Sequence, residues 1–315
     1  MERRVEMKVD LSTLMTEQTN NRSQNIDRLT TLEIIELMND EDQTVAVSVK
    51  RELPQISKAI ELIYESLKNG GRLFYIGAGT SGRIGILDAS ECPPTFCTPP
   101  ELIQGIIAGG KGAVFKAVEG AEDSKENGEY DLAEKQLQAK DVVVGIAASG
   151  RTPYVIGALE YADRIGANTV ALSCNKNAEI SNFAKIGIEI IVGPEVLTGS
   201  TRLKSATAQK MVLNMLTTAT MIKLGKVYGN LMVDLNPSNA KLIERARNIV
   251  KKITGVSYTE AAAILNQTDQ KVKPAIVMIL AGVSLEEANY LLNRTHGFVH
   301  KAIVKAKGGK LACEK

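Results

Sequence analysis

The amino-acid sequence predicts an α/β fold, with a parallel five-stranded sheet covered by helices on both faces and a small helical module on its C-terminal side. Five short and almost wholly apolar runs follow one another between residues 72 and 192, and segments with helical spacing lie between them. Strands buried on both faces read as continuous apolar runs, and their alternation with helices is typical of a parallel sheet. Elsewhere in the chain the apolar residues show helical spacing.

The elements can be placed in order along the chain. Apolar residues recur at helical spacing over residues 32–38 and 56–67, and Gly70 and Gly71 follow the last turn of the second segment. The expected strands cover residues 72–76, 102–107, 141–146, 169–172 and 186–192. After them we expect only helices, over residues 201–228, from residues 236–238 onward, and over residues 258–265, 272–280, 284–292 and 298–306.

This order predicts three parts. Residues 1–70 form a helical segment that packs on the core, residues 71–235 form the sheet domain, and residues 236–315 form the C-terminal helical module.

The composition argues against several classes of protein. Of 315 residues, 38 are Lys or Arg and 36 are Asp or Glu, and the formal net charge of +2 favours neither nucleic acid nor a membrane surface as partner. The most apolar helix candidate, residues 206–224, carries Gln209, Lys210 and Asn214, so we expect no membrane span. The first residues contain arginines without a following apolar stretch, so we expect no signal peptide and a cytoplasmic location.

Cysteine and histidine do not show the pattern of a metal site. Cys92 and Cys97 are close in sequence, but nothing rich in Cys or His completes a site around them, and we expect reduced thiols. The two histidines, His296 and His300, lie in the C-terminal module, where a structural role is expected. Any acid–base catalyst near the sheet is therefore expected to be a carboxylate.

A glycine-rich loop follows the first strand. Residues 77–83 read GAGTSGR: glycine lets the backbone approach a ligand, Thr80 and Ser81 supply hydroxyl groups, and the next helix offers free N–H groups to an anion. The spacing also fits the GxGxxG motif of dinucleotide-binding folds, and a tight turn without a ligand is a third interpretation. We prefer a sugar phosphate, because the four prolines in residues 88–100 are expected to stop the helix early and leave an irregular loop.

A second loop of the same kind follows the third strand. Residues 147–153 read AASGRTP, which places hydroxyl groups and a glycine at the end of the strand and a proline at the start of a helix. Because parallel strands end at the same edge of a sheet, the two loops are expected to clamp one phosphorylated ligand.

A third cluster precedes the long helix. Residues 199–205 read GSTRLKS, and Ser200 or Thr201 is expected to cap this helix. Arg202 and Lys204 either bring positive charge to a phosphate or are solvated surface residues.

Three glutamates stand near these loops in the sequence. Glu91 lies in the proline-rich loop, and Glu119 and Glu122 lie in residues 118–124, between two helical segments. An isolated glutamate in a loop is usually a solvated surface group, but the loops that follow parallel strands are where ligand sites form. These carboxylates are therefore the candidates for acid–base chemistry.

Four motifs together resemble the N-acetylmuramic acid 6-phosphate etherase family, which has the sugar-isomerase (SIS) fold and is related to glucokinase regulatory protein. The motifs are IGAGTSGRIG at residues 76–85, DASECPPTF at 88–96, VEGAEDS at 118–124 and GPEVLTGSTRLK at 193–204. Residues 16–23, TEQTNNRS, also resemble the family's N-terminal segment. The resemblance covers nearly the whole chain.

The resemblance implies a SIS-type, flavodoxin-like sheet as sugar-phosphate-binding domain, a C-terminal module similar to a ubiquitin-associated (UBA) domain, and a homodimer. The implied activity is a lyase-type etherase that releases D-lactate from N-acetylmuramic acid 6-phosphate during cell-wall amino sugar recycling, without a metal or organic cofactor. The family's catalytic glutamates fall on Glu91, as proton donor, and on Glu122. Ser81 and the loop of Ser149, Gly150, Arg151 and Thr152 match the family's sugar-phosphate loops. Together with the loops described above, we predict substrate binding by these residues and by Gly79, Thr80, Arg83, Thr201, Arg202 and Lys204.

Two other functions fit the same fold, since a fold does not by itself fix a function. A sugar-phosphate isomerase would also use a carboxylate base but would need no acid for a leaving group. A non-catalytic sugar-phosphate sensor would bind the ligand and regulate a partner. The two glutamate motifs favour the etherase.

Overall fold

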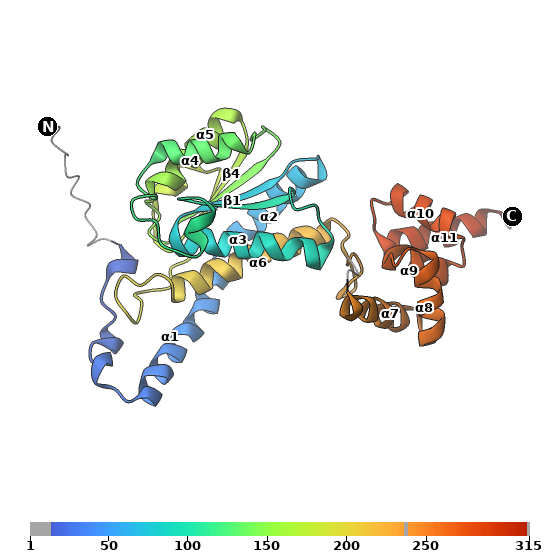
Figure 1. Cartoon of the computed structure of the whole chain (residues 1–315), viewed down its shortest axis with the longest axis horizontal. Helices are drawn as coiled ribbons and strands as arrows, with labels where there is room; N and C mark the ends of the chain where they lie inside the picture. The colour runs from blue at the N-terminus through green and yellow to red at the C-terminus, as the bar shows by residue number, and fades with distance from the viewer. Residues whose placement is uncertain (1–13, 236–238, 314–315) are drawn as a thin grey trace. The chain divides into compact units, whose positions relative to one another are not determined.

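The computed structural model describes residues 14–235 and 239–313 (Figure 1). Contacts within the chain divide it into two compact units, Met1–Asp88 with Ile103–Leu216 and Ala89–Leu102 with Thr217–Lys315. The division into parts at residues 70 and 235 stays a prediction.

The first unit contains the predicted sheet, five parallel strands in the order β2-β1-β3-β4-β5. The strands are β1 (Leu73–Gly77), β2 (Ile103–Ile107), β3 (Val142–Ile146), β4 (Asn168–Ser173) and β5 (Ile186–Glu189). Every residue of β1 and β3 is buried, as continuous apolar runs predict. The strand order reverses between β1 and β3, and open parallel sheets bind their ligands beyond the carboxyl ends of the strands at such a position.

Helices cover both faces of the sheet, which confirms the predicted fold class (Figure 1). α4 (Lys125–Glu134) and α5 (Pro153–Ile165) pack on the face that contains Phe74 and Val143. α2 (Leu53–Lys68) and α3 (Gly79–Phe96) cover the other face, where a side chain at Gly85 of α3 would lie 2.9 Å from Cβ of Tyr75.

Two glycines bring α4 and α5 close together. A Cβ atom at Gly128 would lie 2.0 Å from the carbonyl oxygen of Tyr154, and one at Gly157 would lie 2.1 Å from the carbonyl oxygen of Lys125. Any larger residue would force the helices apart. This packing fixes the start of α5, and with it the loop that follows β3.

The N-terminal segment is helical, as predicted. Three short 3-10 turns, η1 (Met15–Glu17), η2 (Asn21–Ser23) and η3 (Ile26–Arg28), precede α1 (Thr31–Arg51). Asn175, which follows β4, binds the first turn: it accepts a hydrogen bond from the Met15 amide at 2.7 Å and donates one to Oγ1 of Thr16 at 3.1 Å. The segment is therefore tied to the carboxyl end of the sheet.

α3 differs from the prediction. The prolines were expected to end this helix early, but it continues through Pro93 and Pro94 to Phe96. A proline removes its own N–H but keeps its carbonyl, and the carbonyl of Pro93 accepts a hydrogen bond from the Cys97 amide at 3.0 Å. Glu91 therefore lies on a helix, and its predicted position in an irregular loop is wrong.

The second unit is a helical bundle with its own apolar core, formed by residues such as Leu265, Ile276 and Leu292. Its helices are α7 (Ala240–Thr254), α8 (Tyr258–Gln267), α9 (Val272–Ala281), α10 (Leu285–Arg294) and α11 (Val299–Cys313). The four short helices predicted after residue 258 are confirmed, whereas the predicted helix start at residues 236–238 lies outside the described residues. The C-terminal helical region agrees with the predicted fold class.

The predicted end of the long helix is wrong. α6 (Lys204–Lys223) ends before residue 228, and a two-stranded antiparallel ribbon follows, β6 (Val227–Tyr228) and β7 (Leu231–Met232). The intervening residues, Gly229 and Asn230, are typical of a two-residue hairpin turn, and Gly229 has a φ of +57°. Among the described residues, no single helix is both long and apolar enough to cross a membrane; only α9 and α10 together, bent by 107°, pass such a test, and α9 contributes to the bundle core.

Candidate active site

A cavity of about 150 Å³ lies at the carboxyl ends of β1 and β2, where the sequence predicts ligand binding. Gly79 and Arg83 line it from the start of α3, and Glu119 and Glu122 line it from the segment that follows β2. The structure therefore brings together residues from two of the predicted site motifs. A larger cavity of about 460 Å³ lies between α5, η5 (Glu179–Phe183) and the first residues of β4, and no predicted site residue lines it.

The glycine loop after β1 allows the backbone to approach its neighbours closely. Gly79 begins α3 with a φ of +52°, in the region that favours glycine. A Cβ atom at Gly82 would lie 2.6 Å from both the carbonyl oxygen of Gly77 and Cγ1 of Ile107, so only glycine fits there. The first turn of α3 consequently starts directly at the end of the strand, with its N–H groups available to an anion.

Ser81 and Thr80 differ in their surroundings. Ser81 is buried and donates a hydrogen bond to Oε1 of Gln209 on α6 at 3.0 Å. Thr80 is partly exposed at the start of α3. Gln209, which sequence analysis did not single out, fixes the orientation of the Ser81 hydroxyl group.

Arg83 connects α3 to the segment after β2. Its Nε donates a hydrogen bond to the carbonyl oxygen of Val114 at 2.9 Å, and its Nη2 donates one to the carbonyl oxygen of Ala113 at 2.8 Å. Both carbonyl groups belong to η4 (Lys111–Val114), which leads into the segment with Glu119 and Glu122. Arg83 lines the cavity and also holds one of its walls in place.

The loop after β3 lies next to the Glu122 segment. The backbone amide of Tyr154 in α5 donates a hydrogen bond to the carbonyl oxygen of Glu122 at 3.0 Å. Within the loop, Oγ of Ser149 accepts a hydrogen bond from the Arg151 amide at 3.3 Å, and Gly150 has a φ of +73°. Thr152 occupies the N-cap position of α5 without a side-chain capping bond.

Glu122 has the environment of an acid–base group. Its side chain reaches solvent at the edge of the cavity, but protein atoms surround part of its carboxyl group. Partial burial among the surrounding protein atoms, followed by the negative charges of Asp123 and Glu119, raises the pKa of Glu122 above its ordinary value. A carboxyl group with a raised pKa exchanges its proton closer to neutral pH, which suits general acid–base catalysis.

Glu91 is not among the residues that line this cavity. It is exposed on α3, in the part of that helix that belongs to the second unit. The motif that predicted Glu91 is therefore helical, with Glu91 exposed and Asp88, Cys92 and Phe96 buried.

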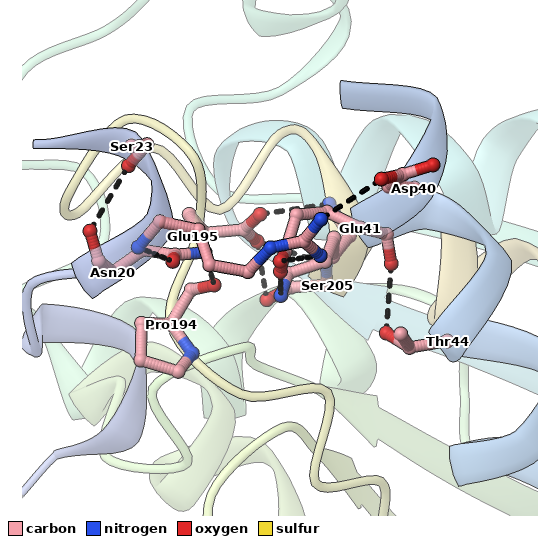
Figure 2. Close-up of polar contacts among 10 residues, drawn as sticks. Asn20, Ser23, Asp40, Glu41, Thr44, Pro194, Glu195 and Ser205 are labelled. Atoms are coloured by element: carbon pink, nitrogen blue, oxygen red, sulfur yellow. Dashed lines mark hydrogen bonds and ion pairs between the residues drawn. The ribbon is translucent and has the colours of Figure 1, made fainter. Parts of the chain in front are cut away.

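The third cluster is organised by two glutamates (Figure 2). Glu195 is fully buried and accepts hydrogen bonds from the amides of Lys204 and Ser205 at 2.9 Å, and from Oγ of Ser205 at 2.9 Å. It occupies the capping role expected of Ser200 or Thr201. Nζ of Lys204 lies 2.6 Å from Oε2 of Glu41, and both side chains are buried. Thr201 is partly buried and Arg202 is exposed.

The described cysteines differ in their surroundings. Cys92 and Cys174 are buried, Cys97 is exposed, and none of the three forms a disulfide. Burial raises the pKa of the Cys174 thiol to about 12. Over residues 14–235 and 239–313, no group of three or more His, Cys, Asp or Glu side chains is arranged to hold a metal ion.

Comparison with known proteins gives matches along most of the chain. Residues 55–163 match the model of the glucokinase regulatory protein N-terminal SIS domain, and residues 123–219 match that of the SIS domain. An N-acetylmuramic acid 6-phosphate etherase of Clostridium beijerinckii is 60% identical over 272 residues, which cover 86% of this chain and 90% of that protein. The etherase of Aliivibrio fischeri is 56% identical over 274 residues, which cover 87% of this chain and 91% of that protein.

Among solved structures, a phosphoheptose isomerase of Francisella tularensis aligns with a TM-score of 0.47 and 18% identity. The alignment covers 62% of this chain and 100% of that chain.

Proposed function

Because the chain belongs to the N-acetylmuramic acid 6-phosphate etherase family, we propose that it cleaves the D-lactyl ether of N-acetylmuramic acid 6-phosphate. The products are N-acetylglucosamine 6-phosphate and D-lactate. The reaction returns an amino sugar of the cell wall to carbohydrate metabolism.

The chemistry follows from the substrate. An ether is hard to hydrolyse because an alkoxide is a poor leaving group. In the open-chain sugar, the C1 aldehyde acidifies the hydrogen on C2, so a base can remove it as a proton. The electron pair of the broken C2–H bond moves into the C1 carbonyl, which forms an enolate. When the carbonyl forms again, this pair makes a C2–C3 double bond and expels the lactyl oxygen from C3. The departing oxygen takes a proton from an acid. Water then adds at C3, and a proton returns to C2.

This path requires one base and one acid, and each such group typically contributes about 10²–10⁴-fold to the rate. The substrate's own carbonyl accepts the electron pair, so the chemistry needs neither a metal nor an organic cofactor. Two carboxyl groups in different environments can supply both functions, one ionised and one protonated.

We assign Glu122 to the proton transfer at C2. The observation that carries this assignment is the hydrogen bond from the Tyr154 amide to the Glu122 carbonyl oxygen, at 3.0 Å, which ties the Glu122 segment to the start of α5. Glu122 also shares a cavity with Gly79 and Arg83. Its raised pKa supports an acid–base role.

The phosphate is proposed to bind between the loops that follow β1 and β3. Support comes from the strand order, because β1 and β3 flank the position at which an open parallel sheet binds ligands. The backbone N–H groups at the N-terminus of α3 would donate hydrogen bonds to the phosphate. The hydroxyl group of Thr152, which makes no capping bond to α5, would donate another. The proposed substrate-binding residues from these loops are Gly79, Thr80, Ser81, Arg83, Ser149, Gly150, Arg151 and Thr152.

Glu91 is proposed as the acid that protonates the departing lactyl oxygen and then activates water. The family motif supports this role, and the exposed position of Glu91 on α3 makes its carboxyl group accessible. We further propose a homodimer in the cytoplasm, with each site completed by the neighbouring subunit. The support is the family resemblance, together with the exposure of Glu91 on α3, which leaves its carboxyl group open to a neighbouring subunit.

The test is an assay of the purified chain with N-acetylmuramic acid 6-phosphate and no added metal or cofactor. We expect D-lactate and N-acetylglucosamine 6-phosphate in equal amounts. Interconversion of aldose and ketose phosphates without lactate would indicate an isomerase instead. Binding of the substrate without turnover would indicate a sensor.

A further inference from the structure

The segment between β5 and α6 is held at its ends and open at its tip. Its tip, around Leu197, Thr198 and Gly199, is exposed, as is Arg202. Glu195 near its start and Lys204 at its end are buried. A segment of this length without regular secondary structure needs side-chain contacts to keep one conformation.

Glu195 fixes the start of α6. Its carboxylate accepts hydrogen bonds from the amides of Lys204 and Ser205 and from the Ser205 hydroxyl group, each at 2.9 Å. A negative charge at the N-terminus of a helix is stabilised both by the free N–H groups and by the helix dipole. Because these amides are already used by Glu195, they are not available to a bound phosphate.

Lys204 fixes the end of the segment. Its Nζ lies 2.6 Å from Oε2 of Glu41 on α1, and the two side chains are only 3% and 9% exposed. Burial opposes ionisation of Glu41, but the hydrogen bond and charge of Lys204, with a further contribution from Arg22, hold the pKa of Glu41 below its ordinary value. A buried ion pair of this kind is strongly disrupted when one partner alone is removed.

Arg22 extends the contacts to the N-terminal segment. Its guanidinium lies 2.9 Å from Glu41 and 2.8 Å from the exposed Asp40. Nearby, Nδ2 of Asn20 donates a hydrogen bond to the carbonyl oxygen of Pro194 at 3.4 Å. Arg22 and Lys204, the two positive charges of this group, are therefore both paired with carboxylates, Arg22 with Asp40 and Glu41 and Lys204 with Glu41.

We propose that Lys204, Glu41 and Glu195 are positioning residues, which hold the segment of residues 196–203 so that Thr201 and Arg202 can join the loops after β1 and β3 in binding the substrate's phosphate. This inference rests on the proposed function. It replaces the expectation that Lys204 itself contacts the phosphate.

The decisive comparison is between Lys204→Met and the double variant Lys204→Met/Glu41→Gln. The single change leaves a buried carboxylate without its lysine, and we expect the KM for N-acetylmuramic acid 6-phosphate to rise ~10- to 100-fold, with a smaller change in kcat. The double change removes both charges, so we expect the KM to return to within a few-fold of the wild-type value. Asp40→Asn is the matched control, because it removes the exposed carboxylate that also pairs with Arg22. We expect the KM of this variant to be unchanged.

Failure of the double variant to recover would overturn the proposal, because a lysine that binds the phosphate directly cannot be replaced by removing Glu41. If Lys204→Met does not fold, the double variant alone decides: a KM near the wild-type value supports positioning, and a strongly raised KM contradicts it.

A second readout does not depend on turnover. For the same variants, calorimetry measures the binding of N-acetylglucosamine 6-phosphate. Amide hydrogen exchange measures the order of residues 196–203. We expect faster exchange in Lys204→Met and in Glu195→Gln, and wild-type exchange in the double variant and in Asp40→Asn. Unchanged exchange in Lys204→Met would contradict the proposal even if the chain released no lactate, whereas a lack of lactate alone would contradict only the proposed function.

Discussion

The backbone amide of Tyr154 lies 3.0 Å from the carbonyl oxygen of Glu122, and this hydrogen bond joins the segment after β2 to the helix that follows β3. Glu122 is therefore held by the part of the fold that also carries the Ser149–Thr152 loop. This contact fixes the backbone of Glu122 relative to the start of α5, and a fixed backbone position favours the acid–base role that we propose for its side chain.

The pH dependence of kcat/KM tests the environment of Glu122. As a base, Glu122 must be ionised, so activity falls as the pH falls through its raised pKa. Glu119→Gln removes one of the negative charges that raise this pKa, and we expect the acid side of the profile to move to lower pH. Glu36→Gln, on the exposed side of α1, is the control. An identical profile for Glu119→Gln would contradict the assignment.

The same shift has a consequence for stability. Because the pKa of Glu122 is raised in the folded protein, its carboxyl group binds a proton more tightly in the folded state than in the unfolded chain. This tighter proton binding stabilises the fold at low pH, and the stabilisation is lost as the pH rises through the raised pKa. At neutral pH Glu122→Gln is therefore expected to have a Tm at least as high as that of the wild type. A clearly lower Tm in thermal unfolding would contradict this reasoning.

The contact between α4 and α5 predicts an overpacking effect. Gly157→Ala would place a methyl group 2.1 Å from the carbonyl oxygen of Lys125, and we expect a loss of about 1–3 kcal/mol or more in the free energy of unfolding. Gly308→Ala, near the end of α11, has nothing within 4 Å of the added atom and serves as control. Denaturant unfolding measures both; equal midpoints would show that the helices can separate without cost.

Mixing of subunits tests the proposed shared site. If Glu91 of one subunit acts with Glu122 of its neighbour, Glu91→Gln and Glu122→Gln homodimers are each inactive, but a mixed dimer contains one intact site. Random exchange of subunits is then expected to restore about a quarter of wild-type activity. No recovery after exchange, verified by native mass spectrometry, would place both glutamates in one subunit.

The strands were predictable because a parallel sheet imposes a local signal: each strand is buried on both faces and must be apolar throughout. The loops after β1 and β3 were predictable for a related reason, since glycine and hydroxyl residues follow directly on those runs. The continuation of α3 through Pro93 and Pro94 was not, because proline forbids only particular hydrogen bonds and the rest of the turn still forms.

The contacts that organise the third cluster depend on residues far apart in the sequence. Lys204 pairs with Glu41 on α1, and Glu195 reaches forward to the amides of α6. In a local sequence pattern, a lysine or glutamate that will be buried looks the same as one that will be exposed. Only the folded chain shows which charges neutralise one another.

The assignment of Glu122 as base and Glu91 as acid is tested most directly by hydrogen exchange at C2 of N-acetylmuramic acid 6-phosphate in D₂O, followed by NMR together with D-lactate release. Glu91→Gln keeps the base but lacks the acid, so we predict deuterium incorporation at C2 with little or no lactate. Glu122→Gln should show neither, although calorimetry should still detect substrate binding. Deuterium incorporation or lactate release at the wild-type rate by Glu122→Gln would contradict the account.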